Sequence, residues 1–402
     1  MRGARGTQFK FRGPLSVKAL MAFAGMVLSG GIAGAEADAQ SSLSTSQAAS
    51  RPALTRETKL SYRIGSGFNS FANEREQEQS IGLSVDGDLR MRLLPRLTLS
   101  ARGSARLASG YAQSRFGDQV PSSGLSLQEV VMAARILNFD SAKLTLSAGA
   151  VNQRDLGADL LVSSQPFPGV REILTVGSKA FSVRLWAQQT IPTSKTLSTR
   201  SIDAEVTPSF MTETVELMIE PLDGLKAKAY ATHFVFNNLP SAVAVDSVVY
   251  GNTTDETGPL TSQFKYRFEG FLGGGSVEAE LGRSMGLGLN GYLVQNAAAP
   301  EGYRNAQKIE TFLRIGLPGD IDLTPSAGVF FSESDVAPGF YNSSELGHNN
   351  RQGWLAAIET LFKEERFKLR GEYVDADLIN SSRDQSRQQF FMVRFETLYD
   401  LF

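Results

Sequence analysis

The sequence predicts an all-β fold, an antiparallel β-barrel of about sixteen strands whose connections alternate between short and long. Three observations predict it. Apolar and polar residues alternate with a period of two through many stretches of about ten residues. Turn-forming residues separate these stretches. Glycine is abundant, at 38 of 402 residues, which suits many strands joined by turns better than a helical bundle.

Residues 1–39 have the features of a secretory signal peptide. A basic segment comes first, with Arg2, Arg5, Lys10, Arg12 and Lys18. Residues 19–32 are apolar or small, and Ala37-Asp38-Ala39 matches an A-x-A cleavage site, so the mature chain is expected to begin at Gln40. A membrane-anchoring helix is the alternative, but the run is short and contains several glycines. Residues 40–57, rich in Ser, Ala and Thr, predict a flexible tail.

Charge and cysteine content narrow the function. The chain has 40 Lys and Arg against 42 Asp and Glu, and removing residues 1–39 makes it more acidic. A nucleic-acid partner usually requires a basic excess, so none is expected. A secreted chain without cysteine has no disulfides, and its stability has to come from extensive hydrogen bonding and packing.

The clearest strand pattern covers residues 81–93. Its odd positions are Ile81, Leu83, Val85, Gly87, Leu89, Met91 and Leu93, and its even positions are Gly82, Ser84, Asp86, Asp88, Arg90 and Arg92. Residues 97–107 repeat the pattern, with Arg102 and Arg106 on the polar face. A helix cannot sort residues in this way, because its side chains recur every 3.6 residues.

We expect sixteen strands, at roughly 58–68, 80–93, 96–108, 125–138, 142–152, 172–177, 180–189, 211–220, 225–236, 261–272, 275–295, 307–317, 321–331, 352–362, 367–377 and 387–400. Tight turns are expected near 94–95, 140–141, 177–178, 221–224, 273–274, 318–320 and 363–365, with long polar loops at 69–79, 109–124, 153–171, 190–210, 237–260, 296–306, 332–351 and 378–386. Transmembrane barrels have this asymmetry, with short periplasmic turns and long extracellular loops. A soluble all-β protein, the alternative, has no reason to keep its short turns at one end.

The C-terminal stretch 389–402, QFFMVRFETLYDLF, resembles the terminal strand of Gram-negative outer-membrane proteins, which the barrel-assembly machinery recognises. Phe402 is out of phase with the apolar face of that strand, a departure that a bulge or a frayed end would explain. Strand number, loop asymmetry, signal peptide and terminal Phe together make residues 58–402 similar in architecture to the sixteen-stranded trimeric porin superfamily. The resemblance implies an outer-membrane location with residues 40–57 in the periplasm, contact with membrane lipid and lipopolysaccharide, small hydrophilic solutes as cargo, and a homotrimer.

In that family the third outer loop folds into the barrel and narrows it. The matching loop is 153–171, and its apolar residues Leu160, Leu161, Val162 and Phe167 suit a segment packed on the inner wall; covering a neighbouring loop outside is the alternative. With the loop inside, the candidates for the pore constriction are Arg154, Asp155, Asp159 and Arg171. The family places basic wall residues opposite, and here the early strands offer Arg63, Arg90, Arg92, Arg102 and Arg106. Asp86 and Asp88 share this wall, so some of the arginines are expected to be paired and neutralised. Opposed charges across a narrow pore create a transverse field that sorts solutes by charge.

The favoured function is passive diffusion of small hydrophilic solutes, and a mild basic excess among the expected lumen residues predicts a weak preference for anions. One alternative is a channel specific for phosphate, sugars or carboxylates, for which inward Trp186, Tyr230 and Phe234 could stack on sugars. Another is a structural or adhesive barrel with a plugged lumen, which requires large inward apolar clusters that the sequence shows only in patches. Outward aromatic residues, including Tyr266 and Phe268, are expected to anchor the barrel at the membrane interfaces.

An enzyme is not expected, and neither is a cofactor or a metal. The two histidines, His233 and His348, lie in separate segments, and metal-ligating residues do not cluster. The run His233-Phe234-Val235 departs from the His-x-Ser unit of outer-membrane phospholipases. Gly273-Gly274-Gly275 is expected to form a turn rather than a phosphate-binding loop, because no helix follows it.

Overall fold

The computed structural model describes residues 58–73, 77–114, 117–119, 123–193, 205–255, 262–282, 284–364 and 366–400. The predicted signal peptide, the predicted tail and Phe402 lie outside the described residues, so what the sequence indicates for them stays a prediction. No helix in the described part of the chain is both long enough and apolar enough to cross a membrane.

Sixteen long strands form a closed antiparallel barrel, as the sequence predicted. Each long strand pairs with the long strands before and after it in the chain, and β1 pairs with β19 to close the ring. The long strands are β1 (Thr58–Asn73), β2 (Gln77–Leu94), β3 (Leu97–Ser114), β5 (Gly124–Asn138), β6 (Ala142–Asn152), β7 (Pro166–Gly177), β8 (Phe181–Thr190), β9 (Ser209–Leu222), β10 (Leu225–Asn237), β13 (Phe268–Glu280), β14 (Met285–Asn296), β15 (Asn305–Leu317), β16 (Ile321–Ser332), β17 (Arg351–Phe362), β18 (Phe367–Leu378) and β19 (Gln388–Asp400).

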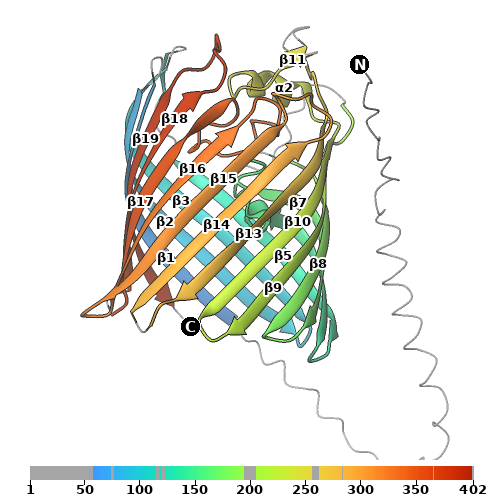
Figure 1. The fold of residues 1–402 in the computed structure, drawn as a ribbon, viewed down its shortest axis with the longest axis vertical. Coiled ribbons are helices and arrows are strands. Elements are labelled where there is room, and N and C mark those ends of the chain that lie inside the picture. Colours follow the sequence, from blue (N-terminus) through green and yellow to red (C-terminus); the bar gives the residue numbers. More distant parts are fainter. Residues whose placement is uncertain are drawn as a thin grey trace, which may run out of the picture. The chain divides into compact units, whose positions relative to one another are not determined.

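The remaining elements are short. β4 (Gly117–Gln119) pairs with the end of β3, and β11 (Thr254–Asp255) pairs with β12 (Gln263–Phe264) in a separate two-stranded sheet. Two helices complete the described chain, the 3-10 turn η1 (Gln153–Leu156) and α2 (Ser241–Val248). In Figure 1 the tight turns gather at one end of the barrel and the longer connections, with α2 and β11, at the other. The predicted asymmetry of the connections is therefore present.

Alternation along β2 shows how the sequence sets the two faces of the wall. Ile81, Leu83 and Val85 are 63%, 46% and 44% exposed on the outer face. The polar residues between them point into the barrel, because successive side chains of a strand point to opposite faces. The outer face is thus apolar towards lipid and the inner face polar, which is the arrangement of a membrane-spanning barrel.

The turn predicted at Gly273-Gly274 is wrong. Both glycines lie in the middle of β13, and the turn to β14 falls after Glu280. A Cβ at Gly274 would lie 2.5 Å from the Tyr230 hydroxyl oxygen, so the glycine is needed for a close cross-strand contact and not for a turn. The shift also reverses the phase of this segment. Phe268, expected to face lipid, is 1% exposed in the core.

The third loop is shorter than predicted, because β7 begins at Pro166 and not at residue 172. Pro166 and Pro168 indicated a loop, yet they pair with Asn152 and Ala150 at the outer end of β6. The loop therefore spans 153–165, and Phe167 and Arg171 belong to the barrel wall.

Candidate pore constriction

The third loop lies inside the barrel. Leu160 and Leu161 are fully buried, and Leu156 and Val162 are 2% exposed. They belong to an apolar cluster with inner-wall side chains of six neighbouring strands, namely Phe167, Trp186, Phe210, Phe234, Phe236, Phe268, Leu272, Tyr292 and Val294. Removing these apolar side chains from water holds the loop against the wall.

The tip of the loop is fastened to the far wall. The Tyr292 hydroxyl on β14 donates to the Asp159 carboxylate and accepts a hydrogen bond from the Leu160 backbone N–H at 3.1 Å. Lys308 Nζ on β15 lies 3.0 Å from the second oxygen of Asp159. Because β14 and β15 are far from β6 and β7 around the ring, the loop crosses the lumen.

A second loop, residues 333–350, supports the third loop from behind. The Ser163 N–H donates to the Tyr341 carbonyl at 2.8 Å, and the Ser343 N–H donates to the Asp159 carbonyl at 2.9 Å. Val336, Tyr341 and Leu346 are buried in the same apolar cluster. Sequence reasoning treated residues 332–351 as a polar outer loop and missed this role, although those apolar side chains were a signal.

Loop 333–350 is tied to the loop after α2 through Asp335. The backbone N–H and the hydroxyl of Thr253 each donate to the Asp335 carboxylate at 2.8 Å. Asn252 Nδ2 donates to the Ser334 carbonyl at 2.8 Å and to the Ala337 carbonyl at 3.0 Å. Burial raises the pKa of Asp335, and the hydrogen bonds from Thr253 act in the opposite direction. Loop 333–350 and the loop after α2 are thus held together by these hydrogen bonds.

The start of the third loop presents its charges to the lumen. Asn152 caps η1, its side-chain oxygen accepting from the Arg154 N–H at 2.9 Å, and Gly157 ends the turn in the left-handed conformation at φ 66°. This short turn leaves the side chains of Arg154 and Asp155 46% and 50% exposed. They are the water-accessible edge of a loop that is otherwise buried.

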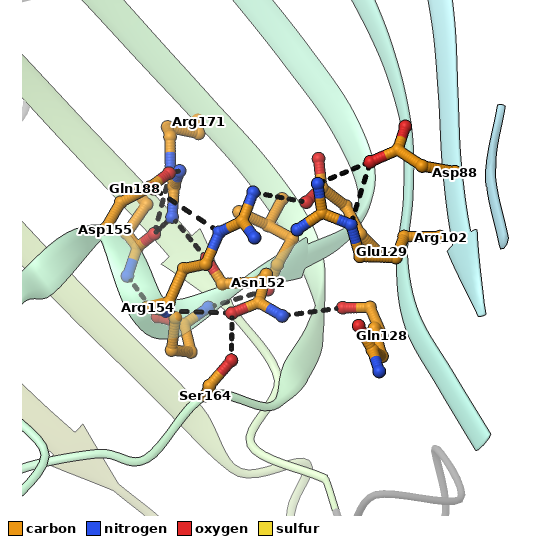
Figure 2. Close-up of polar contacts among 12 residues, drawn as sticks. Asp88, Arg102, Gln128, Glu129, Asn152, Arg154, Asp155, Ser164, Arg171 and Gln188 are labelled. Atoms are coloured by element: carbon orange, nitrogen blue, oxygen red, sulfur yellow. Dashed lines mark hydrogen bonds and ion pairs between the residues drawn. The ribbon is translucent and has the colours of Figure 1, made fainter. Parts of the chain in front are cut away.

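A row of polar contacts runs from this edge to residues of five wall strands (Figure 2). On one side, Arg171 of β7 forms an ion pair with Asp155 and donates to Gln188 of β8 at 2.9 Å. On the other side, Arg154 Nη2 lies 3.7 Å from Glu129 of β5. Further along the wall, Arg102 Nε of β3 donates to Asp88 of β2 at 2.9 Å. Cations and anions alternate along the row.

The predicted loop residues separate into three roles. Arg154 and Asp155 lie together at the exposed edge of the loop. Asp159 lies at the opposite wall beside Lys308. Arg171 is only 6% exposed and belongs to the wall, where it holds the start of the loop.

The predicted wall residues are spread along the inner face of β1–β3. Asp88 and Arg102 pair with each other, Arg63 lies 3.4 Å from Glu396 of β19, and Arg106 lies over Gly82. Asp86, Arg90 and Arg92 occupy the same face of β2, with the two arginines near its tight-turn end.

Sequence reasoning missed Glu129, Tyr292 and Lys308 as partners of the loop. Glu129 points inward because of a bulge between Leu127 and Glu129, which reverses the phase of β5 after Leu125 and Leu127. A period-two pattern does not reveal one extra residue. Tyr292 was hidden by the misplaced turn before β14.

The wall of β17–β19 carries paired charges as well. Lys368 lies 3.4 Å from both Glu359 and Glu396, and Arg370 lies 3.5 Å from Glu359. The side chains of Lys368, Arg370 and Glu359 are 29%, 34% and 30% exposed. Water therefore reaches charged groups on this side of the lumen too.

The remaining candidates do not form a site. Trp186 is 4% exposed beneath the Arg171 guanidinium, which lies 5.1 Å from its ring, and Phe234 is fully buried, so neither offers a face to a sugar. His233, on β10, contacts Phe271, and His348, in loop 333–350, contacts Tyr250. The two histidines are therefore apart. Among the described residues, no three His, Cys, Asp or Glu side chains group to hold a metal.

Solved outer-membrane porins share the closed antiparallel β-barrel fold of this chain. OprB from Pseudomonas putida, in its high-pH structure, has this fold with a TM-score of 0.54 at 10% sequence identity, over 86% of this chain and 94% of that one. OmpT of Vibrio cholerae, in a loop L8 deletion mutant, matches with a TM-score of 0.49 at 8% identity, over 86% of this chain and 99% of that one. No family model and no curated protein sequence matches the chain.

Proposed function

We propose that this chain forms a water-filled channel through which small hydrophilic solutes diffuse passively across the outer membrane. One observation carries the proposal. Charged side chains stay water-accessible beside the loop that crosses the lumen, with Arg154, Asp155 and Asp88 between 40% and 50% exposed. Water inside a barrel at the level of its narrowing loop supports a path for solutes.

The passage is eccentric. The apolar cluster of the third loop and loop 333–350 fills the outer part of the lumen beside β8–β18, where the inward side chains include Phe234, Phe268 and Phe330. The inner faces of β1–β3 are polar at the same time, and there the cluster has no member. Solutes then pass between the charged edge of the third loop and the wall of β1–β5. Nearer the tight turns they meet the charged side chains of β17–β19.

Size is the main filter of such a passage, and charge is a weak one. Arg102 pairs with Asp88, Arg154 with Glu129, and Arg171 with Asp155, which reduces the field across the opening. The inner faces of β2 and β3 nevertheless carry Arg90, Arg92, Arg102 and Arg106 against Glu78, Asp86 and Asp88. This local basic excess supports a weak preference for anions.

Single-channel recording in planar bilayers tests the proposal. The full chain is expected to give ohmic steps, with a reversal potential in a salt gradient that shows slight anion preference. Arg154→Ala removes a side chain from the edge of the loop and is expected to raise conductance. Lys363→Ala, at the tight turn where Lys363 pairs with Asp322 at 2.9 Å, is the matched control. Clear cation preference would refute the anion proposal alone.

A barrel with a plugged lumen is the second candidate, and the size of the apolar cluster favours it. The cluster joins the third loop, loop 333–350, α2 and the inner wall, so it is more than the patches expected from the sequence. Absence of any conductance from folded, heat-modifiable protein would support this candidate and refute the pore. A small step that one solute class blocks would instead support a substrate-specific channel.

Several properties complete the proposal. Residues 1–39 direct the chain to secretion, the barrel-assembly machinery recognises the C-terminal strand, and the barrel resides among outer-membrane lipid and lipopolysaccharide of a Gram-negative cell. A homotrimer and the absence of catalytic activity belong to the same proposal. Chemical cross-linking of membranes, followed by electrophoresis with and without heating, tests both the barrel and the trimer.

A further inference from the structure

A shallow trough lies on the inner wall at the tight-turn end of the barrel. Gly286 and Gly288 of β14 leave room for two side chains of β15. A Cβ at Gly288 would lie 2.1 Å from the ring of Phe312, and one at Gly286 would lie 3.1 Å from Arg314 Nη2. The Phe312 ring and the Arg314 guanidinium therefore lie over β14 and form the floor of the trough.

Two positive and two negative side chains surround this floor. The strand register places Lys226 opposite Glu278, and it places both Glu280 and Arg314 opposite Gly286. Arg314 Nη2 and Glu280 Oε1 are 3.6 Å apart, and these side chains are 46% and 56% exposed. All four charged groups line one open pocket, which Phe312 and Gly224 also line.

The balance of charge selects for a class of ligand. Two cations and two anions give no net attraction for a simple anion or a simple cation. A molecule with an ammonium and a carboxylate a few ångströms apart gains from both signs at once. The aromatic floor adds an apolar contact for its side chain.

We infer that this pocket binds small zwitterions, in particular α-amino acids with an apolar or aromatic side chain. The carboxylate lies between Lys226 and Arg314, the ammonium between Glu278 and Glu280, and the side chain on the Phe312 ring. The inference extends the proposed pore by assigning a solute class. It concerns binding at the periplasmic end of the barrel. This binding does not depend on whether the outer half of the barrel conducts.

The inference is tested by measuring the binding of phenylalanine to the detergent-solubilised full chain. Saturation-transfer NMR and calorimetry are the two measurements. N-acetylphenylalanine keeps only the carboxylate, and phenylalanine amide keeps only the ammonium. Both are expected to bind at least tenfold more weakly than phenylalanine. Lys226→Met and Glu278→Gln are each expected to weaken phenylalanine binding by a similar factor. The matched pair Lys363→Met and Asp322→Asn, an ion pair at another tight turn, is expected to leave it unchanged.

The outcomes separate this inference from the proposed pore. Equal binding of phenylalanine and its two blocked forms would overturn the inference, and so would undiminished binding to the Lys226 and Glu278 variants. Binding without conductance would support the binding pocket and refute the pore. Conductance without binding would support the pore and refute the binding pocket. Heat-modifiable migration of each variant confirms that its barrel is folded before binding is measured.

Discussion

Tyr292→Phe removes one hydroxyl, and with it the bond that holds the tip of the third loop to the far wall. That hydroxyl donates to the Asp159 carboxylate and accepts from the Leu160 N–H. A hydrogen bond to a charged group contributes about 1.5–3 kcal/mol. Since about 1.4 kcal/mol corresponds to a factor of ten, the detached state of the tip is expected to become about 10- to 150-fold more populated.

The chain has no cysteine, so a single introduced thiol reports on this detachment. Leu160 is fully buried, and Leu160→Cys should react with a thiol reagent only while the tip is detached. Its modification rate is expected to rise about 10- to 150-fold when Tyr292→Phe is added. Tyr373→Phe, at a tyrosine that contacts Trp354 on the outer face, is the control. An unchanged rate with Tyr292→Phe would refute the anchoring role of Tyr292.

Three further predictions concern stability. Leu161→Ala empties a fully buried site in the lumen cluster and is expected to lower the free energy of unfolding by about 2–5 kcal/mol, measured by denaturant titration; a loss below about 1 kcal/mol would contradict that packing. Gly274→Val collides with Tyr230 and is expected to lower the melting temperature, whereas Gly87→Ala, with no atom within 4 Å of the new Cβ, is expected to leave it unchanged. Because the pKa of Asp335 is raised in the folded chain, its contribution is most favourable below the ordinary carboxyl pKa and is lost as pH rises through the raised value. Asp335→Asn should therefore gain stability relative to the parent chain as pH rises from 3 to 7, and a difference that does not vary with pH would count against this.

The strand pattern could be predicted because lipid and water impose it residue by residue. Ile81, Leu83 and Val85 face lipid, and the residues between them face water, so period two was visible in the sequence. The predictions from the sequence fail where backbone geometry, and not the polarity of the side chains, determines which way a residue points. Gly274 makes room for Tyr230, and the bulge before Glu129 adds a single residue, and neither leaves a mark on the hydrophobic pattern.

The contents of the lumen were harder to predict for another physical reason. Apolar residues in a loop show that the loop is covered but not what covers it. Leu160 and Leu161 correctly indicated a packed segment, while its partners Tyr292 and Tyr341 come from positions more than a hundred residues away. Only the closed barrel brings those segments together. Arg154 and Asp159 were candidates from the sequence, but the pairing of Arg154 with Glu129 and of Asp159 with Lys308 was not expected.

Single-channel current during covalent blocking tests the eccentric, water-filled passage most directly. Arg154→Cys places a thiol on the exposed edge of the third loop, and Phe330→Cys places one in the apolar cluster, where the native side chain is 3% exposed. A bulky thiol reagent is expected to reduce the current stepwise in Arg154→Cys and to leave Phe330→Cys unaffected. Conducting channels whose current does not change after complete modification at position 154 would contradict a passage beside this loop.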